Sequence, residues 1–323
     1  MMSHEGRWPN SSEGSTSTIK SLDPREPSEL ALWTASQLAY RIKNRPNTPV
    51  RRSFTELTPG INSGLKVPPL AQLIRGGRGG SVRLRLLLAL LWIAAAPPYE
   101  VRMPARAWAQ LLDLPDPAGK GARRVADATR WLQQRSLIEV VPNEGGSNTL
   151  RILNEAGNEQ PYEPPGAAYQ RLRDDPAAAG KHLYVRLPST LWTYGWMAVL
   201  SPAAIAMLII LYVQLGRSGT AGTSGAVWIS PSYAKESFKL SDETRARGLR
   251  ELEVAGLVTV QRRELDASNV LAERRFRNVY RIEPQRFERK AFVPADNGPV
   301  DRSSRQVEGE RGARRIEPAH KAE

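Results

Sequence analysis

The chain has 323 residues, enough for two domains of ordinary size with linkers between them. It contains no cysteine, which excludes disulfides, thiolate nucleophiles and cysteine-based zinc or iron–sulfur sites. The formal net charge of +13 favours a polyanionic partner, nucleic acid before a membrane surface, because arginine and lysine neutralise phosphates and release counterions.

Residues 1–80 are rich in turn-forming and basic residues, and we expect a mostly disordered basic region with a short amphipathic helix at residues 30–42. The run Arg75-Gly-Gly-Arg78-Gly-Gly allows two interpretations. One is a flexible connector. The other is an arm that contacts phosphate, because glycine permits close backbone approach and arginine donates two parallel hydrogen bonds. The polar N-terminus does not resemble a signal peptide, so we expect a cytoplasmic, nucleoid-associated protein.

Residues 81–155 form the first predicted domain. Apolar periodicity and the positions of proline and glycine predict its elements in order. They are a helix at residues 82–96, a strand at 99–103, a helix at 104–112, a helix at 122–135, and a hairpin with strands at 137–141 and 149–153.

A Pro/Ala/Gly-rich linker at residues 156–180 precedes a second predicted domain, residues 181–284. Its predicted elements are a strand at 182–187, helices at 202–215, 231–238 and 241–255, and strands at 227–230, 257–263 and 275–282. Residues 285–323 are predicted to be a disordered charged tail in which Phe287 and Phe292 dock locally. The apolar runs at 84–96 and 199–215 are shorter than a membrane span and are predicted to be buried core helices, so we expect no membrane partner.

The two predicted domains repeat each other at an offset of 120 residues. Three apolar residues of each hairpin region match, with Leu137, Ile138 and Val140 recurring as Leu257, Val258 and Val260. The pairs Arg130/Arg250 and Leu132/Leu252 keep the same offset, and so do Leu88, Leu90 and Leu91 with Leu208, Ile210 and Leu211. A repeat of this length is typical of a duplicated domain.

The stretch from Ser241 to Val260 is the most informative part of the sequence. A polar N-cap precedes a helix whose apolar residues share one face, and Gly256 ends the helix before a strand. The pattern Thr244, Leu249, Leu252, Gly256, Leu257, Val258 resembles the third helix and first wing strand of winged-helix DNA-binding domains. The fold class expected from this resemblance is mainly α with small β-hairpins (α+β), as two tandem winged helix-turn-helix domains with disordered tails. The alternative is a surface helix that leads into an ordinary strand.

The resemblance implies that the third helix of each domain enters the major groove of double-stranded DNA. Arg247 is the first candidate for a base contact, because arginine binds guanine O6 and N7 through two hydrogen bonds. For each arginine a solvated helix face is the alternative. The candidate DNA-binding residues are Lys120, Arg123, Arg124, Asp127, Arg130, Ser241, Asp242, Thr244, Arg245, Arg247, Arg250, Arg262, Arg263, Arg274, Arg275 and Arg277.

Catalytic and cofactor patterns are not recognisable in the sequence. The three histidines are His4, His182 and His320, two of them in the predicted tails, so we expect no metal site, no cofactor and no enzyme activity. Trp108, Trp131, Trp192 and Trp196 could serve as base-stacking platforms, but their apolar neighbours favour core packing.

Two winged helices with basic tails resemble non-nicking plasmid or phage replication initiators, and also winged-helix transcription regulators of the GntR or MarR sort. The first resemblance implies a mobile-element initiator that binds repeated origin sites. The second implies a regulator that binds a promoter palindrome as a homodimer. A third interpretation is a winged-helix protein–protein module within a segregation or chromatin assembly.

Overall fold

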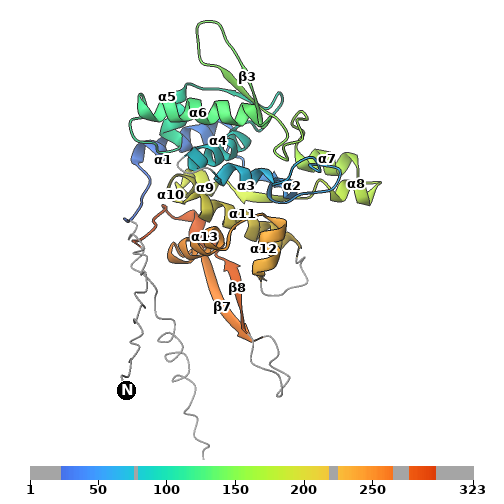
Figure 1. Ribbon diagram of the computed structural model, residues 1–323. Coiled ribbons are helices and arrows are strands. Elements are labelled where there is room, and N and C mark those ends of the chain that lie inside the picture. The colour runs from blue at the N-terminus through green and yellow to red at the C-terminus, as the bar shows by residue number, and fades with distance from the viewer. Residues whose placement is uncertain (1–22, 76–78, 218–224, 265–275, 296–323) are drawn as a thin grey trace, which may run out of the picture. The chain divides into compact units, whose positions relative to one another are not determined.

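Two apolar helices, α4 (Gly79–Ile93) and α11 (Pro202–Arg217), lie against each other inside the folded unit Pro24–Pro294 (Figure 1). The computed structural model of the protein describes residues 23–75, 79–217, 225–264 and 276–295. Both helices are buried over almost their whole length, as predicted for the two apolar runs. Within the described ranges, no helix combines the length and the apolar character that crossing a membrane requires.

The helix α4 begins the first copy of a recurring arrangement. It is followed by β2 (Glu100–Arg102), α5 (Ala105–Leu111), α6 (Lys120–Gln134), β3 (Ile138–Val141) and β4 (Thr149–Ile152). The strands form an antiparallel sheet in the order β2-β4-β3, and α6 packs on both α4 and α5. The predicted sequence of helix, strand, two helices and hairpin is therefore present.

The second copy repeats this order after α11. It contains β6 (Ala226–Val227), α12 (Pro231–Ser237), α13 (Asp242–Val254), β7 (Val258–Glu264) and β8 (Phe276–Ile282). Its antiparallel sheet has the corresponding strand order β6-β8-β7, and α13 packs on α11. The mixed α and β class with small antiparallel sheets is thus as expected.

The offset of 120 residues extends to individual hydrogen bonds. In the first copy the Leu137 N–H donates to the Leu132 carbonyl at 3.1 Å, and in the second the Leu257 N–H donates to the Leu252 carbonyl at 2.9 Å. All four leucines are buried. Each helix thus ends on the same turn and directs the following strand into its sheet in the same way.

The N-terminal region contains the short helix predicted at residues 30–42, but it is more ordered than the mostly disordered region that was predicted. Its described part forms α1 (Glu29–Arg41), β1 (Asn47–Arg51), α2 (Arg52–Thr55) and α3 (Pro69–Ile74). Strand β1 pairs with β5 (Tyr184–Pro188), which lies more than 130 residues away, and Val50 and Phe54 are fully buried. A composition average over residues 1–80 misses these few apolar residues, whose partners are distant in sequence. Residues 1–22 lie outside the described ranges.

The predicted linker at 156–180 is also ordered. It contains α7 (Pro165–Arg171) and α8 (Pro176–Gly180), and α7 packs on β1. The buried guanidinium of Arg51 forms an ion pair with Glu155 at 2.6 Å and donates to the carbonyl of Glu163. This pair attaches the N-terminal strand to the segment that joins the two copies.

The segments that flank the second copy also pack on the core. Two short helices, α9 (Thr190–Thr193) and α10 (Trp196–Val199), precede α11, and Trp192 stacks on Trp92 of α4 with ring centroids 5.2 Å apart. The predicted disordered tail is instead ordered as far as residue 295. Phe287, in η1 (Pro284–Glu288), is buried, whereas Phe292 is 38% exposed. Residues 296–323 lie outside the described ranges.

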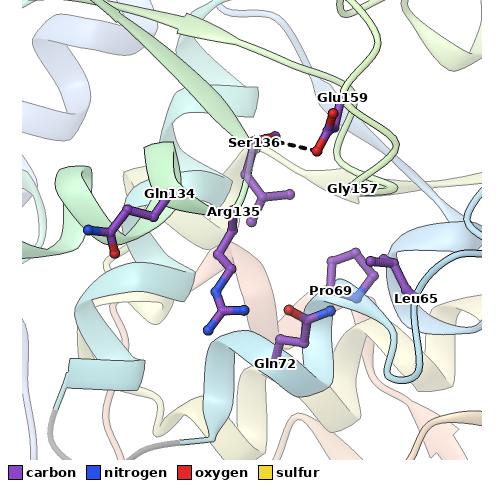
Figure 2. A pocket seen from close by; sticks show the side chains of 9 residues that line it. Leu65, Pro69, Gln72, Gln134, Arg135, Ser136, Gly157 and Glu159 are labelled. Atoms are coloured by element: carbon purple, nitrogen blue, oxygen red, sulfur yellow. Dashed lines mark hydrogen bonds between the residues drawn. The ribbon is translucent and has the colours of Figure 1, made fainter.

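We predict that Ser136→Gly stabilises the protein. Ser136 holds φ of 53° at the end of α6, where the second copy has Gly256 at φ of 70°. Relief of the left-handed strain outweighs the added chain entropy of glycine, so the free energy of unfolding should rise by about 1 kcal/mol. The loss of a 3.3 Å hydrogen bond from the Ser136 hydroxyl to Glu159 (Figure 2) opposes this gain only weakly. The reciprocal Gly256→Ser should destabilise, and equal urea midpoints for both variants and the wild type would contradict the assignment.

We also predict that Gly248→Ala destabilises the protein by about 1–3 kcal/mol. A Cβ atom at position 248 would lie 2.7 Å from the carbonyl carbon of Ala203 and 2.8 Å from Cγ of Met207, so α13 would have to move away from α11. The matched control is Gly216→Ala. Gly216 lies in α11, and an added Cβ atom there would have open space around it, so this change should be neutral or stabilising. Thermal unfolding of both variants tests the difference.

Candidate nucleic-acid interface

The N-terminal turn of α13 is fixed by its own side chains. The Ser241 hydroxyl accepts from the Thr244 N–H at 3.2 Å and contacts the Thr244 hydroxyl at 2.9 Å. Asp242 forms an ion pair with Arg245 at 3.2 Å. Of the residues predicted to contact DNA, Ser241 therefore caps the helix, Thr244 donates to that cap, and Arg245 is held along the helix by its acidic neighbour.

The orientation of α13 is set by its buried face. Gly248, Leu249 and Leu252 pack toward α11, and the buried carboxylate of Glu251 accepts at 2.7 Å from both Arg25 and the backbone N–H of Ser201. Because Leu249 and Leu252 face inward, Arg247, which lies nearly opposite them around the helix, is on the exposed face. Arg250 is half-buried at the edge between the two faces.

A second half-buried arginine joins the two copies near this point. Arg85 of α4 donates at 2.7 Å to the carbonyl of Leu200, which lies just before α11 in the chain. Burial, together with the neighbouring charge of Arg25, lowers the pKa of Arg85 to about 10. Arg25 itself donates to the carbonyl of Val199 at 2.6 Å. Arg25 thus links the N-terminal segment to α13 and to the residues before α11, and Arg85 links the first copy to the same residues before α11.

The first copy presents a comparable exposed face on α6. Five of the predicted residues are exposed there: Lys120, Arg123, Arg124, Asp127 and Arg130. Asp127 and Arg130 form a 3.1 Å ion pair whose side chains are 71% and 68% exposed, so the pair contributes little to stability. Val125, Ala128 and Leu132 occupy the opposite, buried face of the helix.

The β7–β8 ribbon brings arginines together on one face. Its register places Arg263 of β7 directly opposite Arg277 of β8. Arg281 lies further along β8. Residues opposite each other in an antiparallel pair share a face, and like charges in this position are destabilising. Arg262 lies on the other face, with its guanidinium 4.2 Å from the ring centroid of Phe276. The predicted residues Arg274 and Arg275 lie outside the described ranges.

An aromatic residue extends the basic face of the ribbon. The Arg277 guanidinium lies 5.1 Å from the ring centroid of Trp228, whose side chain is 47% exposed. Sequence reasoning missed Trp228 because it considered tryptophans on helices, and Trp228 follows the two-residue strand β6. The sequence feature that could have identified Trp228 is its position as a large aromatic residue between a short strand and the Ser-Pro start of a helix. The core assignment of Trp108, Trp192 and Trp196 is confirmed by their burial.

The predicted residues form two surfaces, one on each copy. Helix α6 packs on α4, α4 contacts α11, and α11 packs on α13, so the two central helices separate α6 from α13. Figure 1 shows the first copy in the upper part of the folded unit and the β7–β8 ribbon at its lower end. The α13 arginine and the ribbon arginines belong to the same copy.

The comparisons with known proteins add no family assignment, since no protein-family model, curated protein or solved structure matches this chain. Within residues 23–75, 79–217, 225–264 and 276–295, no group of three or more His, Asp or Glu residues could hold a metal ion. The exposed cations of α6, α13 and the β7–β8 ribbon are therefore the features of the molecule that bear on its function.

We predict that Arg263→Thr raises the stability of the free protein by roughly 0.2–1 kcal/mol, because it removes the like-charge pair with Arg277 and supplies a residue suited to strands. The matched control is Arg262→Thr, one position away, which removes the contact with Phe276 and should lower stability. Chemical unfolding without added ligand measures both changes. A loss of stability in Arg263→Thr equal to that in Arg262→Thr would contradict the proposed repulsion.

Proposed function

We propose that this protein binds double-stranded DNA through two winged-helix units that share one core. The proposal is supported by the order of helix, strand, two helices and hairpin, which occurs twice around α4 and α11. The observation that carries it is the pairing of Arg263 with Arg277 on the ribbon next to the helix that presents Arg247. A polyanion that contacts this face would turn a repulsive arrangement into an attractive one.

In this proposal α13 enters the major groove with its N-terminal end first. Arg247 then donates to guanine, while Asp242 and Arg245 remain paired with each other along the helix. The ribbon lies along the backbone or the adjacent minor groove, where Arg263, Arg277 and Arg281 neutralise phosphates. The exposed ring of Trp228 lies beside the same face.

The first copy would contact DNA through α6, whose Lys120, Arg123 and Arg124 lie in its first two turns. Because both copies belong to one chain and are packed on adjacent central helices, one molecule could bind two neighbouring DNA segments. This arrangement favours a replication initiator that binds repeated origin sites. A dimeric transcription regulator that binds a palindrome is the second candidate, and a protein–protein module that lacks salt-dependent DNA affinity is the third.

Selection from random duplex DNA at physiological salt distinguishes these roles. One recurring motif in direct repeats supports the initiator, and a palindrome bound by two chains supports the regulator. If no sequence is enriched and the affinity for DNA does not change with salt, DNA binding is contradicted and the protein–protein module is favoured.

On the selected site, we expect Arg247→Ala to weaken binding by roughly 1–3 kcal/mol and to relax the preference for guanine at one position. The control is Arg289→Ala, which removes an exposed arginine distant in sequence from both reading helices. Fluorescence anisotropy with the selected duplex and with single-base variants measures both effects. An unchanged binding isotherm for Arg247→Ala would show that this residue does not read the site.

We expect Arg263→Thr to act differently from Arg247→Ala. A phosphate contact has no sequence preference, so binding should weaken about equally on all duplexes. The slope of log K against log salt concentration should fall in magnitude by about 0.9 for each phosphate that the variant no longer neutralises. A change confined to one base position would instead indicate that Arg263 contacts a base.

A further inference from the structure

Four basic side chains converge on one cavity next to the C-terminal end of α6. The cavity has a volume of about 420 Å³ and is lined by Lys66, Arg75, Arg83 and Arg135, together with Trp131 and Gln72. None of its lining residues is acidic. Figure 2 shows the adjoining smaller pocket, which shares Gln72 and Arg135 with this cavity.

The close approach of α3 and α4 creates one wall of the cavity. A Cβ atom at Gly80 would lie 2.8 Å from the carbonyl oxygen of Leu73, so the first turn of α4 can lie against the last turn of α3 because residue 80 has no side chain. This contact places Arg75, at the end of α3, and Arg83, in the second turn of α4, on the same cavity. Arg75 begins the Gly/Arg run, which the sequence predicts to be either a flexible connector or an arm that contacts phosphate, and Arg83 follows this run.

Trp131 holds two of the guanidinium groups in place. The Arg83 guanidinium lies 4.6 Å from the ring centroid of Trp131, and the Arg135 guanidinium lies 5.0 Å from it. These contacts restrict both arginines before any ligand arrives, which lowers the entropic cost of binding. They also occupy the ring, so Trp131 holds arginines rather than offering a surface on which a base could stack.

The four cations have no carboxylate partner among the described residues. Elsewhere the protein pairs its arginines readily, as in Arg52 with Glu56 at 2.8 Å and Arg171 with Glu163 at 2.8 Å. Clustering four like charges in a concave site raises the local positive potential. An anion with several acceptor oxygens would neutralise that potential and could accept from two guanidinium groups at once.

One lining residue connects the cavity to the second copy. Arg75 donates at 2.8 Å to the backbone carbonyl of Lys239, in the turn between α12 and α13. Lys239 precedes the N-cap of α13, Ser241, by two residues. A phosphate bound in the cavity would therefore lie close to the start of the helix that is proposed to read DNA.

We propose that this cavity binds a phosphate group through Lys66, Arg75, Arg83 and Arg135. The phosphate belongs either to the backbone of a DNA duplex bound along α13 or to a free phosphorylated ligand. The DNA source depends on the proposed function of the protein, whereas the phosphate site itself does not.

The first test uses inorganic pyrophosphate as the probe and the full-length chain. Thermal unfolding should show a saturable rise in Tm with pyrophosphate, beyond that produced by sodium chloride at equal ionic strength. The double variant Lys66→Glu/Arg135→Glu should bind at least tenfold more weakly, because two of four cations are reversed in sign. Lys66 and Arg135 are not buried, so these changes leave the core intact, and the double variant Arg41→Glu/Arg289→Glu, at two exposed arginines, is the charge-matched control.

The second test measures the salt dependence of duplex binding by the same variants. If the cavity holds a backbone phosphate, the slope of log K against log salt should fall in magnitude by about 0.9 in the double variant relative to the charge-matched Arg41→Glu/Arg289→Glu. If the double variant no longer binds pyrophosphate while the slope is unchanged, the site takes a free phosphorylated ligand.

Both of these results support the phosphate site. It is overturned if the wild type shows no saturable effect of pyrophosphate and the double variant keeps the full salt slope. If the protein binds no duplex at all, the proposed function fails while the pyrophosphate measurement alone still decides whether the cavity is a phosphate site.

Discussion

The close packing of α13 on α11 is the constraint on which the proposed interface depends. Gly248 has no side chain, so α13 can approach the backbone of Ala203, and Glu251 then reaches Arg25 and the start of α11. Leu249 and Leu252 also face inward, and helical periodicity places Arg247 nearly opposite them, on the exposed face. The N-terminal segment, the end of α10 and the first copy all contribute contacts around this junction. The direction in which the exposed arginine points is thus a result of core packing.

Arginines brought close to one another mark the two places to which we assign ligands. On the β7–β8 ribbon, Arg263 and Arg277 face each other, and in the cavity beside α6, Arg83 and Arg135 share one tryptophan ring. The pairing of Arg263 with Arg277 costs stability in the free protein, since like charges opposite each other repel. In the cavity, the contacts with Trp131 offset part of the repulsion between Arg83 and Arg135. A bound phosphate would favour both arrangements. On the ribbon, stability and binding should therefore change in opposite directions, as Arg263→Thr tests.

The sequence predicted a large part of the fold, but not the segments around it. The two apolar helices and the helix-to-strand turns at Leu137 and Leu257 follow from local periodicity and turn residues, and they are present where expected. Apart from the short helix α1, the ordered structure of residues 23–75 and 156–180 was not predicted. It depends on the pairing of β1 with β5 and on the buried ion pair of Arg51 and Glu155. Contacts between residues more than a hundred positions apart leave little trace in a composition average.

For the candidate site, the sequence by itself determined which residues carry charge and which helices could present them. Arg123 and Arg247 were identified because a helix with one apolar face must expose the other. Only the tertiary structure decided that Arg263 faces Arg277, and that Lys66, Arg75, Arg83 and Arg135 line one cavity. The physical reason is that strand register and the approach of separate helices are set by packing between distant segments. Periodicity within one segment fixes which face a side chain occupies, but not what lies across from it.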